Sequence, residues 1–393
     1  MNRAVISHRS LTLRLALALL GLVLLSACGS NKSKELKPVA LESVEAEVAL
    51  DRKWSRRIGR GMGKYYHQFR LAVDEQHLYA AAADGRVYQL NKETGRVRWR
   101  VTLNDGLTSG VAVDQQHVYV ATDAGVLLAL DKQNGEQVWS RQLNSELVSP
   151  PSSTNNHVVL QTSSGSIYNL NAQTGEQRWR FDTTMPSLSL RGNSRPTFFA
   201  SFVVLGQANG KLAVLDINTG ELRWDPRIAH ARGDTEIERM VDVNATPLLI
   251  DDHLFAVSYQ GQLVAYDLSS GRPLWTVDES SFNDMARGMG NIYVSSSEGV
   301  VRAYDRRTGD VRWSQNSLLR RKTTAPTAIS SYLVVADYQG YVHLLSQLDG
   351  RIVARARVSR KPVKTTLLAE GNRFYVIADN GRLRAYQIGQ SLK

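Results

Sequence analysis

The sequence predicts an all-β protein, an eight-bladed β-propeller of four-stranded antiparallel blades, and two observations lead to this prediction. First, a glycine is followed ten residues later by a second glycine and four residues after that by tryptophan, as in GVLLALDKQNGEQVW at 125–139. Second, short apolar runs alternate with turn residues, and no long helical pattern interrupts them. A repeat of about 40 residues with four strands is typical of a propeller blade.

The glycine repeat occurs eight times. Six of the seven tryptophans stand in its register, Ala354 takes that place in the seventh copy, and the eighth copy ends with the chain. Each unit of such an array contacts mainly its neighbours, so we expect one domain at 46–393. The copies begin at Gly85, Gly125, Gly165, Gly210, Gly261, Gly299, Gly340 and Gly381.

Within each copy the residue types fit a strand followed by a tight turn. Apolar residues stand two and five positions after the first glycine, as at Val87 and Leu90, and these positions lie on opposite faces of a strand. Both faces are therefore expected to be buried between stacked blades. Aspartate or asparagine then precedes the second glycine, as at Asp131, which is the chemistry of a hairpin turn.

The last copy lacks a fourth strand because the chain ends at Lys393. The remaining tryptophan, Trp54, stands in a short run at 48–58 that has no blade of its own. We expect this N-terminal strand to complete the blade that begins at Gly381. Closing the ring in this way removes the open sheet edges that invite aggregation.

Residues 1–27 have the pattern of a signal peptide that ends in a lipidation site. Arginines precede an apolar run at 15–25, whose eleven residues at about 1.5 Å each are too short for a hydrocarbon layer of about 30 Å. The run ends in Leu-Ser-Ala-Cys, which resembles a bacterial lipobox. The resemblance implies cleavage after Ala27 and acylation of Cys28. An ordinary signal with an incidental cysteine is the alternative.

The residues after Cys28 bear on location. The residue after the cysteine is Gly29, whereas an aspartate at this position resembles a signal for retention in the inner membrane. The glycine therefore implies an outer-membrane protein that faces the periplasm. Residues 28–45 are polar and show no period, and they are expected to form a lipidated tether. Several acyl chains give stable anchoring where one chain is marginal.

Composition limits the partners and cofactors. The net charge is +11, and 45 basic and 37 acidic residues remain after residue 27, but no dense basic block occurs, so we expect no nucleic acid partner. Cys28 is the only cysteine, which excludes an internal disulfide and a cysteine-based metal cluster. The histidines and the turn carboxylates recur at equivalent positions of different blades. No catalytic residue, cofactor or metal site is expected.

The period is stretched at two places, and these are the candidate binding site. Extra residues follow Trp179, around 183–195, and Trp224, around 225–244. Both insertions join the last strand of one blade to the first strand of the next, so they project from one face of adjacent blades. Leu188 and Leu190 have no evident core role and stand beside Arg191, which is typical of a protein-binding surface. Alternatively, the two leucines tuck under their own loop.

Two family resemblances follow from these motifs. The repeat resembles the tryptophan-docking motif of PQQ-dependent quinoprotein dehydrogenases. The lipobox, the eight repeats and the segment 188–191 together resemble the outer-membrane assembly factor family BamB. That second resemblance covers almost the whole chain.

The BamB resemblance implies a non-enzymatic scaffold lipoprotein of the β-barrel assembly complex. Its implied partners are the periplasmic POTRA domains of BamA, with unfolded outer-membrane protein strands as a further candidate. The family carries a second acid where this chain has asparagine. A periplasmic quinoprotein-like dehydrogenase and an envelope glycan-binding propeller are the alternatives. The contact residues are Leu188, Leu190, Arg191, Asp242 and Asn244.

Overall fold

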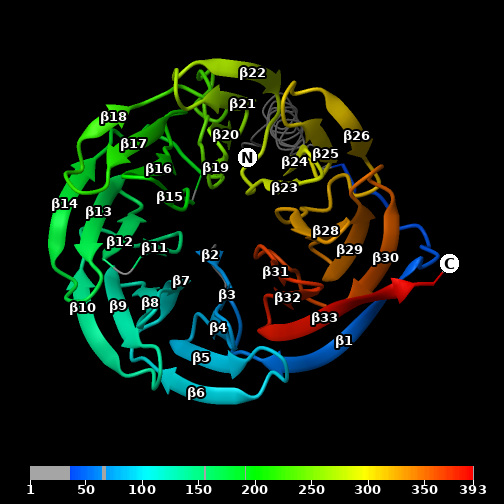
Figure 1. The fold of residues 1–393 in the computed structure, drawn as a ribbon, viewed down its shortest axis with the longest axis horizontal. Helices are drawn as coiled ribbons and strands as arrows, with labels where there is room; N and C mark the ends of the chain where they lie inside the picture. The colour runs from blue at the N-terminus through cyan, green and yellow to red at the C-terminus, as the bar shows by residue number, and fades with distance from the viewer. Residues whose placement is uncertain (1–35, 64–67, 155, 191, 393) are drawn as a thin grey trace, which may run out of the picture. The chain divides into compact units, whose positions relative to one another are not determined.

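The computed structural model describes residues 36–63, 68–154, 156–190 and 192–392. The chain divides into two compact units at Lys37 and Pro38, and every strand belongs to the second unit. Figure 1 shows these strands arranged as a ring of blades. Among the described residues, no helix is long and apolar enough to cross a membrane. The predicted signal peptide and Cys28 lie outside the described residues.

The eight predicted blades are confirmed, each with four antiparallel strands ordered from the centre of the ring outward. Blades 1 to 4 consist of β3 (Ala72–Val73), β4 (His77–Ala81), β5 (Arg86–Asn91), β6 (Val97–Thr102); β7 (Leu107–Val113), β8 (His117–Thr122), β9 (Val126–Asp131), β10 (Gln137–Gln142); β11 (Ser152–Ser153), β12 (His157–Gln161), β13 (Ser166–Asn171), β14 (Gln177–Asp182); and β15 (Thr197–Phe199), β16 (Phe202–Gly206), β17 (Leu212–Asp216), β18 (Leu222–Trp224).

The second half of the ring continues in the same order. Blades 5 to 8 consist of β19 (Leu248–Ile250), β20 (His253–Val257), β21 (Gln262–Asp267), β22 (Pro273–Asp278); β23 (Ala286–Gly288), β24 (Asn291–Ser295), β25 (Val301–Asp305), β26 (Val311–Gln315); β27 (Thr327–Ile329), β28 (Tyr332–Ala336), β29 (Tyr341–Ser346), β30 (Ile352–Arg357); and β31 (Leu368–Glu370), β32 (Arg373–Ile377), β33 (Arg382–Ser391), β1 (Val48–Arg57).

The expected closure of the ring is confirmed in blade 8. The N-terminal strand β1 is the outermost strand of the sheet β31-β32-β33-β1, and it pairs antiparallel with β33. Trp54 lies opposite Ala385 in this register. Figure 1 shows the blue N-terminal strand beside the red C-terminal strand. Two segments from opposite ends of the chain therefore form one blade.

Residues 38–47 differ from the predicted tether, because they are packed against blades 6 and 7. We call this segment the strap. The Val39 N–H donates to the Leu319 carbonyl at 3.1 Å, and the Glu47 N–H donates to the Val353 carbonyl at 2.8 Å. Leu41 packs on the apolar cluster of blades 6 and 7. The predicted tether is therefore wrong for residues 38–45, because the strap packs the half-buried Leu41 on the blades and pairs its backbone with them.

Each tryptophan connects its blade to the next one. The indole N–H of Trp139 donates to the Ala172 carbonyl at 3.0 Å, and the ring covers Gly175, whose added Cβ would lie 2.5 Å from it. A β-bulge just before Trp139 turns its side chain towards the neighbouring blade. The same carbonyl contact is made by Trp54, Trp99, Trp179, Trp275 and Trp313.

Two joints of the ring differ from this pattern. Between blades 7 and 8, Ala354 takes the tryptophan position. The last two strands of blade 8, β33 and β1, come from opposite ends of the chain, so no turn connects them and could receive an indole. Val48 of β1 belongs to the same apolar cluster as Ala354. Between blades 4 and 5, the ring of Trp224 meets that of Tyr266 edge-on with centroids 5.1 Å apart, and a Cβ added at Gly271 would lie 3.9 Å from the indole, farther than at the other joints.

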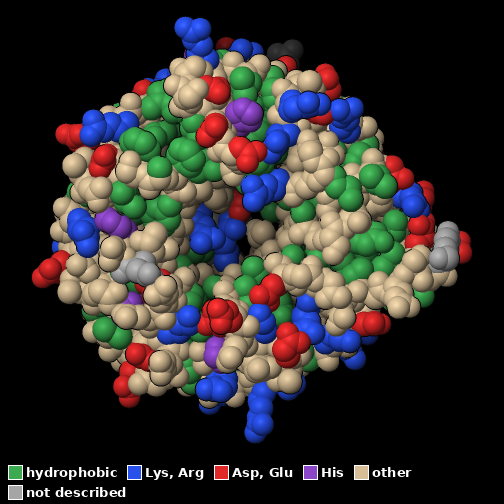
Figure 2. All heavy atoms as spheres, in the orientation of Figure 1, with side chains coloured by type: hydrophobic (Ala, Val, Ile, Leu, Met, Phe, Trp, Pro, Cys, Tyr) green, Lys and Arg blue, Asp and Glu red, His purple; other side chains and the backbone are tan. Residues whose placement is uncertain are grey.

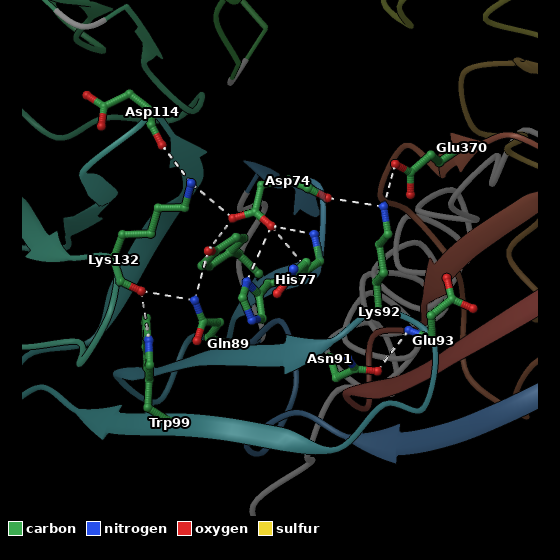
Figure 3. Close-up of polar contacts among 12 residues, drawn as sticks. Asp74, His77, Gln89, Asn91, Lys92, Glu93, Trp99, Asp114, Lys132 and Glu370 are labelled. Carbon is green, nitrogen blue, oxygen red and sulfur yellow. Dashed lines mark hydrogen bonds and ion pairs between the residues drawn. The ribbon is translucent and has the colours of Figure 1, made fainter.

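Lysines add polar contacts to the joints, as Figure 3 shows for blades 8, 1 and 2. The Lys132 carbonyl accepts the N–H of Trp99 at 3.0 Å, while its ammonium pairs with Asp74 of the preceding blade at 2.9 Å. Burial alone would raise the pKa of Asp74, but hydrogen bonds from Gln76, Lys132 and other donors lower it well below its usual range. Lys92 makes the equivalent pair with Glu370 at 2.7 Å.

The centre of the ring holds one strand that the repeat does not predict. Strand β2 (Gln68–Phe69) pairs in parallel with β7, so the connection from blade 8 to blade 1 passes through the middle. Arg70 follows β2 and forms an ion pair with Asp284, from the loop between blades 5 and 6. Figure 2 shows a central hollow with lysine and arginine side chains on its wall.

Candidate functional site

The two insertions form long loops on adjacent blade junctions. The first long loop, 183–196, joins β14 to β15, and the second long loop, 225–247, joins β18 to β19. Because the strands of a blade alternate in direction, these loops emerge on the same face as the turns between second and third strands. Backbone bonds confirm this placement: the Val243 N–H donates to the Gln207 carbonyl in such a turn at 3.0 Å.

The two long loops are bonded to each other. The Leu190 N–H donates to Oδ1 of Asp242 at 3.0 Å, and the Ser187 hydroxyl donates to Oε2 of Glu236 at 3.0 Å. The carbonyl of Asp242 also accepts the Tyr259 N–H of blade 5 at 2.9 Å. Asp242 thus ties together three segments, and the loops form one surface.

Asp242 is a buried carboxylic acid. Its side chain is 0% exposed, and its second oxygen, Oδ2, has no hydrogen-bond partner among the described residues. Burial raises the pKa of Asp242 to about 6, although the Leu190 N–H acts in the opposite direction. This acid cannot itself reach a partner, so any effect on binding passes through the loop that it holds.

The outer part of the second long loop is shaped by a local cap. Oε2 of Glu238 accepts the backbone N–H groups of Asp234 and Thr235 at 2.9 and 3.0 Å. The Arg239 N–H then returns to the Thr235 carbonyl at 3.1 Å, which closes a single turn. These donors lower the pKa of Glu238. The turn places Ile237 at its outer side.

Exposed apolar side chains mark the surface of this site. Leu188 is 41% exposed, Ile237 is 63% exposed, and Phe282 of the loop between blades 5 and 6 is 38% exposed. The ring of Phe282 packs near that of Tyr259, with centroids 6.3 Å apart. The side-chain amide of Gln260 donates to the Ile237 carbonyl at 3.2 Å. We call Leu188, Ile237, Tyr259 and Phe282 the apolar strip.

The residues predicted from the sequence to bind a partner differ in how exposed they are. Leu188 is exposed, Leu190 is half-buried, and Asn244 and Asp242 are buried. Arg191 lies outside the described residues. Sequence reasoning missed Ile237 and Phe282, although each is a lone large apolar residue in a polar loop. Among the described residues, no group of three or more His, Cys, Asp or Glu could hold a metal ion.

Comparison with known proteins gives consistent results. The family model described as outer membrane protein assembly factor BamB matches residues 83–315 and 297–391. A BamB of Pseudomonas aeruginosa is 48% identical, covering 96% of this chain and 97% of its own, and that of Escherichia coli K12 is 35% identical, covering 92% and 96%.

Solved structures show the same relationship. The crystal structure of BamB from Moraxella catarrhalis has a TM-score of 0.80 at 30% identity, covering 86% of this chain and 100% of that one. A quinohemoprotein alcohol dehydrogenase of Comamonas testosteroni is 13% identical with a TM-score of 0.67, covering 88% and 77%, which is a likeness of fold alone. The chain therefore belongs to the outer membrane protein assembly factor family BamB.

Proposed function

We propose that this chain is a non-enzymatic scaffold lipoprotein that binds the periplasmic POTRA domains of BamA through its two long loops. In this proposal Cys28 carries the lipid that holds the protein at the periplasmic side of the outer membrane. The scaffold positions BamA while outer-membrane proteins are inserted. Unfolded strands of those proteins are its second proposed partner.

The observation that carries the proposal is the apolar strip on a rigid base. Exposed apolar side chains rimmed by polar groups are typical of protein-binding surfaces. Here Leu188 and Ile237 stand on the two long loops, which Asp242 holds to each other and to blade 5. A surface held in its binding conformation loses less conformational entropy on association than a flexible loop does.

Co-purification with BamA from detergent-solubilised membranes tests this site. The variant Leu188→Ala with Leu190→Ala and Arg191→Ala should recover at least tenfold less BamA, because removing central apolar contacts typically costs 2 kcal/mol or more. A second variant, Ile237→Ala with Phe282→Ala, should show the same direction of effect.

The matched control is Leu348→Ala, since Leu348 is 78% exposed in a turn on the opposite face. Its BamA recovery should equal that of the unaltered chain. Circular dichroism melting checks that each variant is folded. Full BamA recovery with both folded loop variants would show that the partner binds elsewhere.

A further inference from the structure

Blades 7 and 8 carry a band of exposed basic side chains on the face that bears the long loops. We call it the basic rim. Its members come from four separate stretches of sequence, so no basic block is visible in the sequence itself. They are Arg57, Arg60, Lys322, Arg360, Lys361, Lys364 and Arg382.

The loops and turns that carry the basic rim are joined by backbone hydrogen bonds. Each loop that enters a new blade bonds to the neighbouring turn between second and third strands. Three N–H groups form this chain of contacts. The bonds are Val363 N–H to the Asp337 carbonyl at 3.1 Å, Asp379 N–H to Pro362 at 2.8 Å, and Met62 N–H to Asp379 at 2.9 Å.

The acids of this layer are already engaged. Asp379 pairs with Lys364 at 2.6 Å, and buried Asp337 pairs with Arg321 at 2.7 Å. Asp84 accepts the backbone N–H of Arg60 and pairs with Arg86. The other six side chains of the rim have no ion-pair partner among the described residues, so a positive field extends from them into solvent.

The sector of the same face that holds the second long loop has a different charge balance. The second long loop alone carries five acids against three arginines in 225–242. Screening at physiological salt confines such fields to about 8 Å, so the two sectors act separately. The basic character therefore belongs to blades 7 and 8, not to the whole face.

The strap shows where the chain enters the propeller. Near its start, the Val39 N–H bonds Leu319 and the Arg321 guanidinium donates to the Val39 carbonyl at 3.0 Å, both in the loop between blades 6 and 7. That loop also carries Lys322 of the rim. The ten residues 28–37 precede the strap, and ten residues reach at most about 35 Å.

We propose that the basic rim lies against anionic phospholipid headgroups of the membrane that holds the lipid anchor. The proposal rests on the lipidation of Cys28 that is part of the proposed function. Each basic residue near an anionic membrane surface raises the membrane-binding constant by about fivefold. The strap begins beside the loop that carries Lys322, so in this proposal the lipid anchor and the basic rim face the same membrane surface.

Amine labelling of the mature lipidated protein in proteoliposomes tests this contact. Vesicles of phosphatidylcholine alone, whose headgroup has no reactive amine, are compared with vesicles that also contain phosphatidylglycerol. The phosphatidylglycerol vesicles should lower the labelling rates of Lys322, Lys361 and Lys364 at least threefold, and high salt should restore them. Lys53, exposed on the outer surface of β1, should label equally in both.

Charge variants sharpen the result. Lys322→Gln with Arg360→Gln and Lys361→Gln should remove the phosphatidylglycerol-dependent protection of Lys364. The matched control removes three exposed arginines outside the rim and should leave that protection intact. The control is Arg98→Gln with Arg272→Gln and Arg307→Gln.

The outcomes separate the rim from the rest of the proposed function. Equal labelling in both vesicles, with acylated Cys28 found by mass spectrometry, overturns the rim contact and leaves the anchor in place. Unmodified Cys28 overturns the anchor and the rim contact together, while BamA binding is judged by co-purification. Protection that appears only when BamA is added assigns the rim to a protein partner and overturns the lipid contact.

Discussion

Replacing Asp242 with asparagine should stabilise the protein at neutral pH and should abolish one pH dependence. The pKa of Asp242 is raised from 3.8 to about 6 by burial. At about 1.4 kcal/mol per pKa unit, holding this carboxylate charged in the folded protein costs about 3 kcal/mol. Asparagine keeps an oxygen to accept the Leu190 N–H, and its unpaired amide costs about 1 kcal/mol. The expected net gain at pH 7.5 is about 2 kcal/mol.

The sign of the pH dependence follows from proton binding. Between pH 4 and 6 the folded protein keeps the Asp242 proton while the unfolded chain has lost it, so stability falls as pH rises through this window. Below pH 4 both states are protonated, and the unaltered protein should be at least as stable as Asp242→Asn. Above about pH 6 the advantage of the variant should reach a plateau.

Urea unfolding of both proteins from pH 4 to pH 8 measures this difference. Asp216→Asn is the control, because hydrogen bonds from the Thr219 and Asn218 N–H groups lower the pKa of that half-buried turn acid. The stability of that control relative to the unaltered protein should not increase as pH rises. A constant difference between Asp242→Asn and the unaltered protein across the range would refute the buried, unpaired carboxylate.

Three further predictions concern the joints of the ring. Trp54→Ala should cost about 3 to 5 kcal/mol, because it empties the contact that joins blade 8 to blade 1, and a thermal scan with an unshifted midpoint would contradict this. Trp139→Phe should cost about 1 to 2 kcal/mol, because the Ala172 carbonyl loses the indole N–H and keeps only the longer bond from the Tyr119 hydroxyl at 3.4 Å. Trp224→Phe should cost clearly less in the same urea titration, since that indole N–H has no partner among the described residues. Gly220→Ala places a Cβ 2.6 Å from a tryptophan ring and should destabilise by about 3 kcal/mol or more, whereas Gly290→Ala, with a similar φ and nothing within 4 Å, should cost about 1 kcal/mol.

The fold could be predicted because its determinants are local and repeated. The glycine pair and tryptophan specify a turn and an inter-blade contact within each copy, so eight copies specify eight blades. Even the missing strand was predictable, because Trp54 stood without a blade. The absence of tryptophan at Ala354 became understandable only from the structure, where β33 and β1 have no covalent turn between them.

The two long loops were predicted in position, but the environments of their side chains were not. The stretched period located both long loops, and Leu188 is exposed as expected. The environment of Asp242 depends on packing against Leu190 and Tyr259, which are distant in sequence, so its burial could not be inferred from the motif. The basic rim could not be predicted for the same reason, because its residues are separated by up to 325 positions, from Arg57 to Arg382. Spacing reveals a repeat, but it does not reveal which charges the closed ring gathers.

The pairing of β1 with β33 has a consequence for the order of events in biogenesis. Roughly 325 residues separate the end of one strand from the start of the other, so β1 is synthesised long before its partner exists. Until β33 arrives, β1 has no neighbour in its own sheet, and the last joint of the ring cannot form. Completion of the fold is thereby coupled to completion of the chain. A product truncated before β33 keeps an open strand edge, a feature by which quality-control proteases and chaperones can distinguish it from the finished molecule.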